Sequence, residues 1–227
     1  MIDSLALTRL MHLASPLLPV GAFAYSQGLE TAVDDGNVRD AATARQWILD
    51  CLELGLARFE APILLRLHAA WTEHDVSRVR YWNACFLASR ESAELHAETA
   101  QMGYSLRRLL LDLETNPGTD HSDLAEIDPI SFPAAFAFAA ARWNIPPRDA
   151  LTAYLWSWSE NQVSAALKAV PLGQVAGQTI LVDAQVAVAH AIGRACLLAD
   201  DDLANLLPAL AITCAKHETQ YSRLFRS

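Results

Sequence analysis

The amino-acid sequence predicts an all-α protein, folded as a single-domain bundle of about ten helices over residues 1–227. Along most of the chain, apolar residues recur every three or four positions, whereas the alternation typical of strands never lasts more than a few residues. The composition is 52% hydrophobic with only 9 glycines, and the abundant alanine favours helices in a soluble protein. A chain of 227 residues can bury one substantial core.

In the N-terminal third, prolines and aspartates mark where the predicted helices begin and end. The first helix must end where the segment 15–30, SPLLPVGAFAYSQGLE, begins, because the residue ahead of a proline disfavours helical backbone. This segment is expected to form a structured loop that leads into a short helix. Asp40 can cap the next helix, whose apolar face is expected to run through Leu54, and Pro62 and Asp75 open the two helices that follow.

The middle of the chain contains the most regular apolar pattern. From Leu95 to Leu113, apolar residues alternate at spacings of four and three, as in a helix that packs along a neighbour. The opposite face is expected to be solvated and carries Glu91, Glu94, Glu98, Arg107 and Arg108. Between Glu114 and Ile130 the apolar period is lost, which predicts the longest loop of the protein.

The C-terminal half is organised around a helix that begins near Pro147 and has one amide, Gln162, on its apolar face. A buried glutamine needs partners for both its oxygen and its nitrogen, so this face is expected to have a defined geometry. Pro171 ends that helix, and a small-residue helix over 174–198 follows. Charged and polar side chains within it predict a core helix that does not span a membrane. Pro208 begins the last helix.

The overall composition excludes some classes of protein. A net charge of −9 argues against nucleic-acid binding, which needs a basic face to neutralise phosphates. Polar residues interrupt the first apolar stretch, so no cleavable signal peptide is expected and the cytoplasm is the expected compartment. The cysteines are far apart in apolar helical patterns, and buried free thiols are expected at Cys51, Cys85, Cys196 and Cys214.

No motif in the sequence predicts an enzyme site. The glycines never form GxxxxGK[ST], so the loop that wraps nucleotide phosphates is absent. HETQY at His217 resembles the start of a zinc-protease motif, but Tyr221 replaces the second histidine, and we interpret the match as chance. Glu30 and Lys168 could act as acid and base, although such residues more often form an ion pair that fixes helix geometry. No catalytic residue, cofactor or metal ligand is therefore assigned.

The last residues, 216–227, are predicted to form a docking tail. Arg223 and Arg226 flank Leu224 and Phe225, a cationic and aromatic composition typical of interface anchors. A chain terminus normally frays, so aromatic residues there indicate that the tail docks, either on a partner or on the chain's own body.

Four segments together resemble one family, the urease accessory protein UreF. They are LASPLLPVGAFAYSQGLETAV from Leu13, SRESAELHAETAQMGYSLRRLL from Ser89, AYLWSWSENQVSAALKAVPLGQVAGQ from Ala153 and HETQYSRLFRS from His217. The likeness covers essentially the whole chain, and the first and last segments are the most specific.

The resemblance implies an all-α scaffold without catalytic activity that acts as a homodimer in the cytoplasm. Such proteins join the accessory protein UreD, called UreH in some organisms, and recruit the GTPase UreG. The assembly delivers nickel to the urease apoprotein and supports carbamylation of its active-site lysine. By position, the end of the tail from Tyr221 to Ser227 looks like the segment that orders on meeting UreD, while Glu30 and Lys168 are expected near the surface that faces UreG. The predicted partner-binding residues are Glu30, Lys168, Tyr221, Arg223, Leu224, Phe225 and Arg226.

Two other classes of function remain open. An all-helical lyase or hydrolase would use Glu30 and Lys168, and its substrate should raise its thermal stability. A generic helical adaptor would be stabilised only by other proteins.

Overall fold

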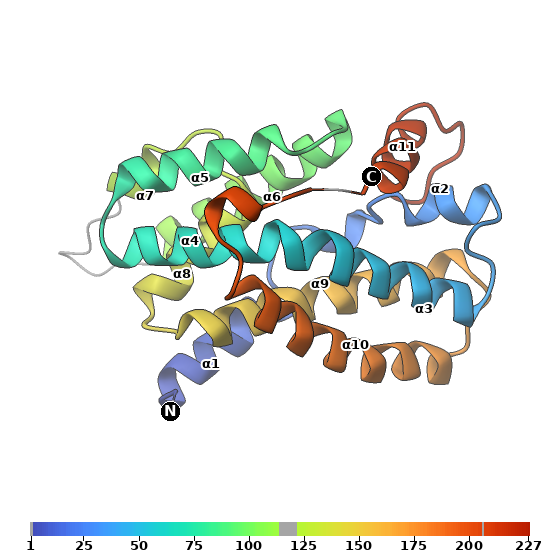
Figure 1. The fold of residues 1–227 in the computed structure, drawn as a ribbon, viewed down its shortest axis with the longest axis horizontal. Coiled ribbons are helices and arrows are strands. Elements are labelled where there is room, and N and C mark those ends of the chain that lie inside the picture. The colour runs from blue at the N-terminus through green and yellow to red at the C-terminus, as the bar shows by residue number, and fades with distance from the viewer. Residues whose placement is uncertain (1, 114–121, 206) are drawn as a thin grey trace.

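The computed structural model describes residues 2–113, 122–205 and 207–227, and every regular element in these ranges is helical. The prediction of an all-α bundle is confirmed (Figure 1). In chain order the α-helices are α1 (Ser4–Leu13), α2 (Leu29–Asp34), α3 (Ala41–Asp50), α4 (Glu60–Thr72), α5 (Val76–Ala88), α6 (Ala93–Leu113), α7 (Ser122–Ala125), α8 (Phe132–Arg142), α9 (Pro147–Ala169), α10 (Gln174–Ala195) and α11 (Pro208–His217).

The core forms around α4, which packs against α5, α8 and α9, and α6 packs against α8 (Figure 1). Leu64 and Leu67 of α4 are fully buried. Where α6 meets α8, a glycine permits close approach: a Cβ atom on Gly103 would lie 2.1 Å from the Ile130 carbonyl oxygen. The longest helices, α9 and α10, lie side by side and are joined by a short turn after Val170.

The predicted caps are present at the start of α3 and α5. The Asp40 carboxylate accepts a hydrogen bond of 2.9 Å from the amide of Thr43, and that of Asp75 accepts one of 3.0 Å from the amide of Arg78. These local bonds satisfy amides that have no partner within the helix. The sequence therefore located these helix starts correctly.

The prediction that the third helix continues to Leu54 is wrong. The α-helix ends at Asp50, and a π-helical turn (η2, Cys51–Gly55) and a 3-10 turn (η3, Leu56–Arg58) lead into α4. A π turn holds more residues than an α turn, so side chains within and after it rotate away from the face they would otherwise share. Leu54 is consequently 41% exposed.

The predicted loop from 114 to 130 is only partly accounted for, because residues 114–121 lie outside the described residues. The remainder contains the single-turn helix α7 and three buried side chains, Leu124, Ile127 and Ile130. Their spacing of three is too short a pattern to be recognised as helical from the sequence.

Two expectations about buried side chains are also corrected. Gln162 is buried, but its Nε2 has no hydrogen-bond partner among the described residues and faces a small cavity of about 40 Å³. All four thiols are free as expected, but only Cys51 and Cys214 are buried and Cys85 is half-buried. Cys196 is exposed, because it follows the last turn of α10 on the outer surface.

Among the described residues, α10 is the one helix long and apolar enough to cross a membrane, a property that core helices of soluble proteins share. Its inner face, which includes Ile180, Ala184 and Val188, is buried in the bundle. This face packs along α9, while 39% of the apolar window of α10 is buried in the bundle.

Candidate functional site

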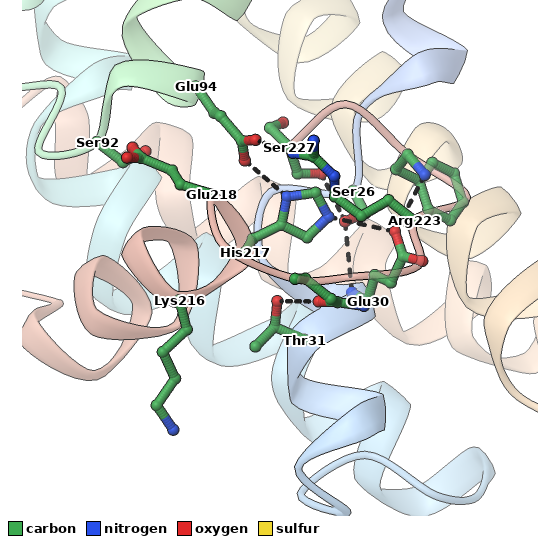
Figure 2. Close-up of polar contacts among 12 residues, drawn as sticks. Ser26, Glu30, Thr31, Ser92, Glu94, Lys216, His217, Glu218, Arg223 and Ser227 are labelled. Atoms are coloured by element: carbon green, nitrogen blue, oxygen red, sulfur yellow. Dashed lines mark hydrogen bonds and ion pairs between the residues drawn. The ribbon is translucent and has the colours of Figure 1, made fainter.

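The predicted tail begins inside α11, which ends at His217, and the part that follows (218–227, the C-terminal tail) lies on the chain's own body. There the carboxylate of Glu30 holds it (Figure 2). Glu30 stands in the first turn of α2 and is 5% exposed. One of its oxygens accepts a hydrogen bond of 2.6 Å from the amide of Leu224, and the other accepts one of 3.0 Å from the amide of Phe225. A buried carboxylate that accepts from backbone amides forms strong, charge-assisted bonds.

His217, the last residue of α11, joins this carboxylate to α6. Its ring is fully buried, with Nδ1 2.6 Å from Glu94 and Nε2 3.2 Å from Glu30. Carboxylate oxygens only accept hydrogen bonds, so each contact is made through a ring nitrogen that carries a proton. Arg223 then donates to the second oxygen of Glu94 at 2.6 Å, which completes a chain of polar contacts from α2 to the tail (Figure 2).

Sequence reasoning missed this role of His217. The HETQY pattern resembles only a zinc motif, and no local spacing links His217 to Glu30 or to Glu94, which are 187 and 123 residues away in the sequence. Among the described residues no group of three or more histidine, cysteine or acidic side chains is arranged to hold a metal ion.

The segment before α2 forms a cradle for the end of the tail. The carbonyl oxygen of Ser227 accepts hydrogen bonds from the amides of Ser26 and Gln27, at 2.6 and 3.0 Å, and from the Ser26 hydroxyl at 2.6 Å. Gln27 and Gly28 both adopt positive φ, of 52° and 80°, which turns successive amides toward one point. The proline- and glycine-rich segment 15–30 is thus structured, as its composition predicted.

Glu98 lies beneath the last residue of the tail, and the expectation that it is solvated is wrong. The side chain is buried because the tail and the segment before α2 cover it. Its oxygens accept hydrogen bonds of 2.7 Å from Gln27 Nε2 and from the Ser227 hydroxyl. Burial raises the pKa of Glu98 to about 7, although these two hydrogen bonds oppose the shift.

The structure brings most of the predicted partner-binding residues together around the tail. Phe225 is buried, and the ammonium of Lys168, in the last turn of α9, lies 5.6 Å from the centre of its ring. This distance is within the range of a cation–π interaction. By contrast, Tyr221 is fully exposed and Leu224 is 72% exposed. From Leu224 to Ser227 the side chains are alternately exposed and buried.

A larger cavity of about 360 Å³ lies next to the cradle, between the segment 13–23 and helices α6, α8, α9 and α10. Its wall includes Glu98 and Tyr154, but neither Glu30 nor Lys168. The two residues considered as an acid and a base are instead both in contact with the tail.

Comparisons with known proteins agree on one family. The model of the UreF family matches residues 38–185. The chain is 56% identical to the urease accessory protein UreF of Azoarcus sp. (strain BH72) over 225 residues, which cover 98% of this chain and 96% of that protein. It is 53% identical to the protein of the same name from Dechloromonas aromatica (strain RCB), with 98% of each chain covered. The protein of that name from Methylobacillus flagellatus is 49% identical over 227 residues, with 100% of both chains covered.

The alignment with the Methylobacillus flagellatus protein spans the whole chain, so it includes the cradle and the tail, which lie outside the range matched by the family model. With the all-helical bundle and this degree of identity, the chain belongs to the UreF family of urease accessory proteins.

Proposed function

We propose that this chain is a non-catalytic cytoplasmic scaffold of urease maturation that bridges UreD, or UreH, and the GTPase UreG, so that nickel reaches the urease apoprotein. Membership of the UreF family supports a role in maturation. The observation that carries the finer proposal is the anchored tail, because its inward residues fix it in place while its outward residues remain available for a partner.

In this proposal UreD binds the outward face of the tail, which includes Tyr221, Leu224 and the exposed Arg226. Glu30, His217 and Phe225 hold the backbone in a defined shape, so binding costs less ordering entropy than it would for a disordered peptide. Glu30 itself is buried and acts on a partner only through the tail. Lys168 is exposed and can meet UreG directly.

The test is co-purification with UreD. The double variant Tyr221→Ala, Leu224→Ala should lose capture of UreD while keeping its helical circular dichroism, and deletion of 221–227 should have the same effect. A matched control is Leu197→Ala, which removes an equally exposed leucine outside the tail. Capture of UreD by the double variant at the unaltered level would refute the role of the tail.

The recruitment of UreG is tested separately. Lys168→Ala should weaken co-purification with UreG, and the unaltered chain by itself should hydrolyse no GTP because it lacks the phosphate-binding loop. GTP turnover without UreG would contradict the scaffold. A small molecule that raises the melting temperature of the chain would favour the lyase or hydrolase instead.

We also propose that the homodimer forms through α10. Its outer face has a stripe with spacings of four and three that contains no charged side chain and consists of Val175, Thr179, Val182, Val186, Ala189 and Gly193. Such spacing is self-complementary when two copies of a helix pack together. Val182→Asp should shift the sizing profile to a monomer, whereas Leu197→Asp should not.

A further inference from the structure

We propose that Trp158 of α9 is a positioning residue for the C-terminal tail, which it holds through the side chain of Gln27. The indole N–H of Trp158 donates a hydrogen bond of 2.7 Å to Oε1 of Gln27. The backbone amide of Gln27 in turn donates one of 3.0 Å to the carbonyl oxygen of Ser227, at the end of the tail. One residue of the cradle therefore connects a helix of the bundle to the tail.

Trp158 fixes which way round the side-chain amide of Gln27 lies. An indole N–H can only donate a hydrogen bond, so the amide atom that it meets must be the oxygen. The amide nitrogen of Gln27 then faces Glu98 of α6, whose Oε1 accepts its hydrogen bond at 2.7 Å. Turning the amide over would place two donors together at Trp158 and two oxygens together at Glu98. The side chain of Gln27 therefore has one favourable orientation.

This restraint supports the backbone conformation that binds the tail. The φ of Gln27, 52°, lies in the left-handed region, which is unfavourable for a residue with a Cβ atom. The same conformation turns the amides of Ser26 and Gln27 toward the carbonyl oxygen of Ser227. Such backbone persists where the surrounding structure restrains it, and the Gln27 side chain is tied to α9 and to α6. The hydrogen bond from Trp158 thus stabilises the cradle.

Asn161 supports the same segment from α9. Its Nδ2 donates a hydrogen bond of 3.1 Å to the carbonyl oxygen of Tyr25, two residues ahead of Gln27. Residues three apart on an α-helix lie on one face, so Trp158 and Asn161 both face this segment. The cradle therefore rests on α9 at two points, and Trp158 is the one that acts on the side chain of Gln27.

Hydrogen exchange at two backbone amides of the full chain measures this role. The amide of Ser26 binds the carbonyl oxygen of Ser227, and the amide of Arg226 binds that of Ala24. Trp158→Phe removes the indole N–H and keeps an aromatic ring. Because the loss of one neutral hydrogen bond shifts an equilibrium by about two- to tenfold, both amides should exchange about two- to tenfold faster.

The matched control is Trp156→Phe. Its indole forms a hydrogen bond with Glu160, four residues further along the same helix, so the variant removes an indole N–H from α9 without touching the cradle. Exchange at the amides of Ser26 and Arg226 should be unchanged. The same acceleration in this control as in Trp158→Phe would overturn the proposal.

A second variant separates positioning from a loss of ring packing. Gln27→Met keeps an unbranched side chain of similar size but has neither polar atom of the amide, so it should accelerate exchange at Ser26 and Arg226 by itself. In the Gln27→Met background, Trp158→Phe should bring no further acceleration, because the indole has already lost its acceptor. Equal acceleration by Trp158→Phe in both backgrounds would show that only the packing of the ring matters, and would refute the positioning role.

If Trp158→Phe does not fold, Gln27→Met decides. The indole N–H of Trp158 and the amide of Arg226 should then both exchange faster than in the unaltered chain, and unaltered exchange at Arg226 would overturn the proposal. As part of a partner-binding tail, this role rests on the proposed function. The exchange experiments use the chain without any partner, so failure to bind UreD and failure of the positioning role are distinguishable results.

Discussion

Replacing Glu30 by glutamine should release the tail while leaving the helical bundle intact. The buried carboxylate of Glu30 accepts from two tail amides, at 2.6 and 3.0 Å, and contacts His217 at 3.2 Å. Glutamine offers one acceptor in place of two, and its amide nitrogen would point at a donor. No charged group then remains at this position to strengthen the bond that survives.

The size of the effect follows from these contacts. A hydrogen bond to a charged group contributes about 1.5 to 3 kcal/mol, so losing one bond and weakening the other should destabilise tail docking by about 2 to 4 kcal/mol. This corresponds to roughly a 30- to 800-fold increase in the population of chains with an open tail. The bundle core contains no part of the tail except Phe225, so far-ultraviolet circular dichroism should be unchanged.

Hydrogen exchange at the amides of Leu224 and Phe225 is the direct assay, since these are the two groups that lose their acceptor. Glu53→Gln, which removes an exposed carboxylate from the π-helical turn, is the control. Equal protection of the two tail amides in Glu30→Gln and in the unaltered chain would show that other contacts hold the tail.

Two further predictions concern the body of the protein. Gly103→Ala should destabilise the fold by about 1 to 3 kcal/mol in urea unfolding, because the new Cβ would collide with the Ile130 carbonyl, whereas Gly173→Ala meets no neighbour at a residue of ordinary φ and should be close to neutral. Among the thiols, Cys196 should react first with an alkylating reagent followed by mass spectrometry, since burial raises the pKa of Cys51 and Cys214 to about 12. Faster modification of Cys51 or Cys214 than of Cys196 would contradict the described burial.

Much of the helix pattern could be predicted from the sequence because the signals are local. Each cap, at Asp40 and at Asp75, is a hydrogen bond formed within four consecutive residues. The proline at the start of α9 likewise affects only the first turn of that helix. The error at Leu54 arose where a π turn changed the period, which an α-helical template cannot detect.

The tail site could be predicted only in part. Its residue types, aromatic and cationic at a chain end, indicated docking, and the positions of Glu30 and Lys168 were singled out. The docking surface itself was not predictable, because it joins Ser26, Glu98 and His217, which are separated by many helices. Glu98 looked like a solvated charge, since its own helix gives no sign that the tail covers it.

The amino-acid sequence determined the order of the helices, their approximate ends and the presence of a docking tail, because propensity, capping and periodicity act between neighbouring residues. Only the tertiary structure decided that a histidine lies between two glutamates and that a third glutamate is buried under the last serine. Burial and hydrogen-bond partners are properties of segments that meet in space, and they set the charge states on which the tail depends.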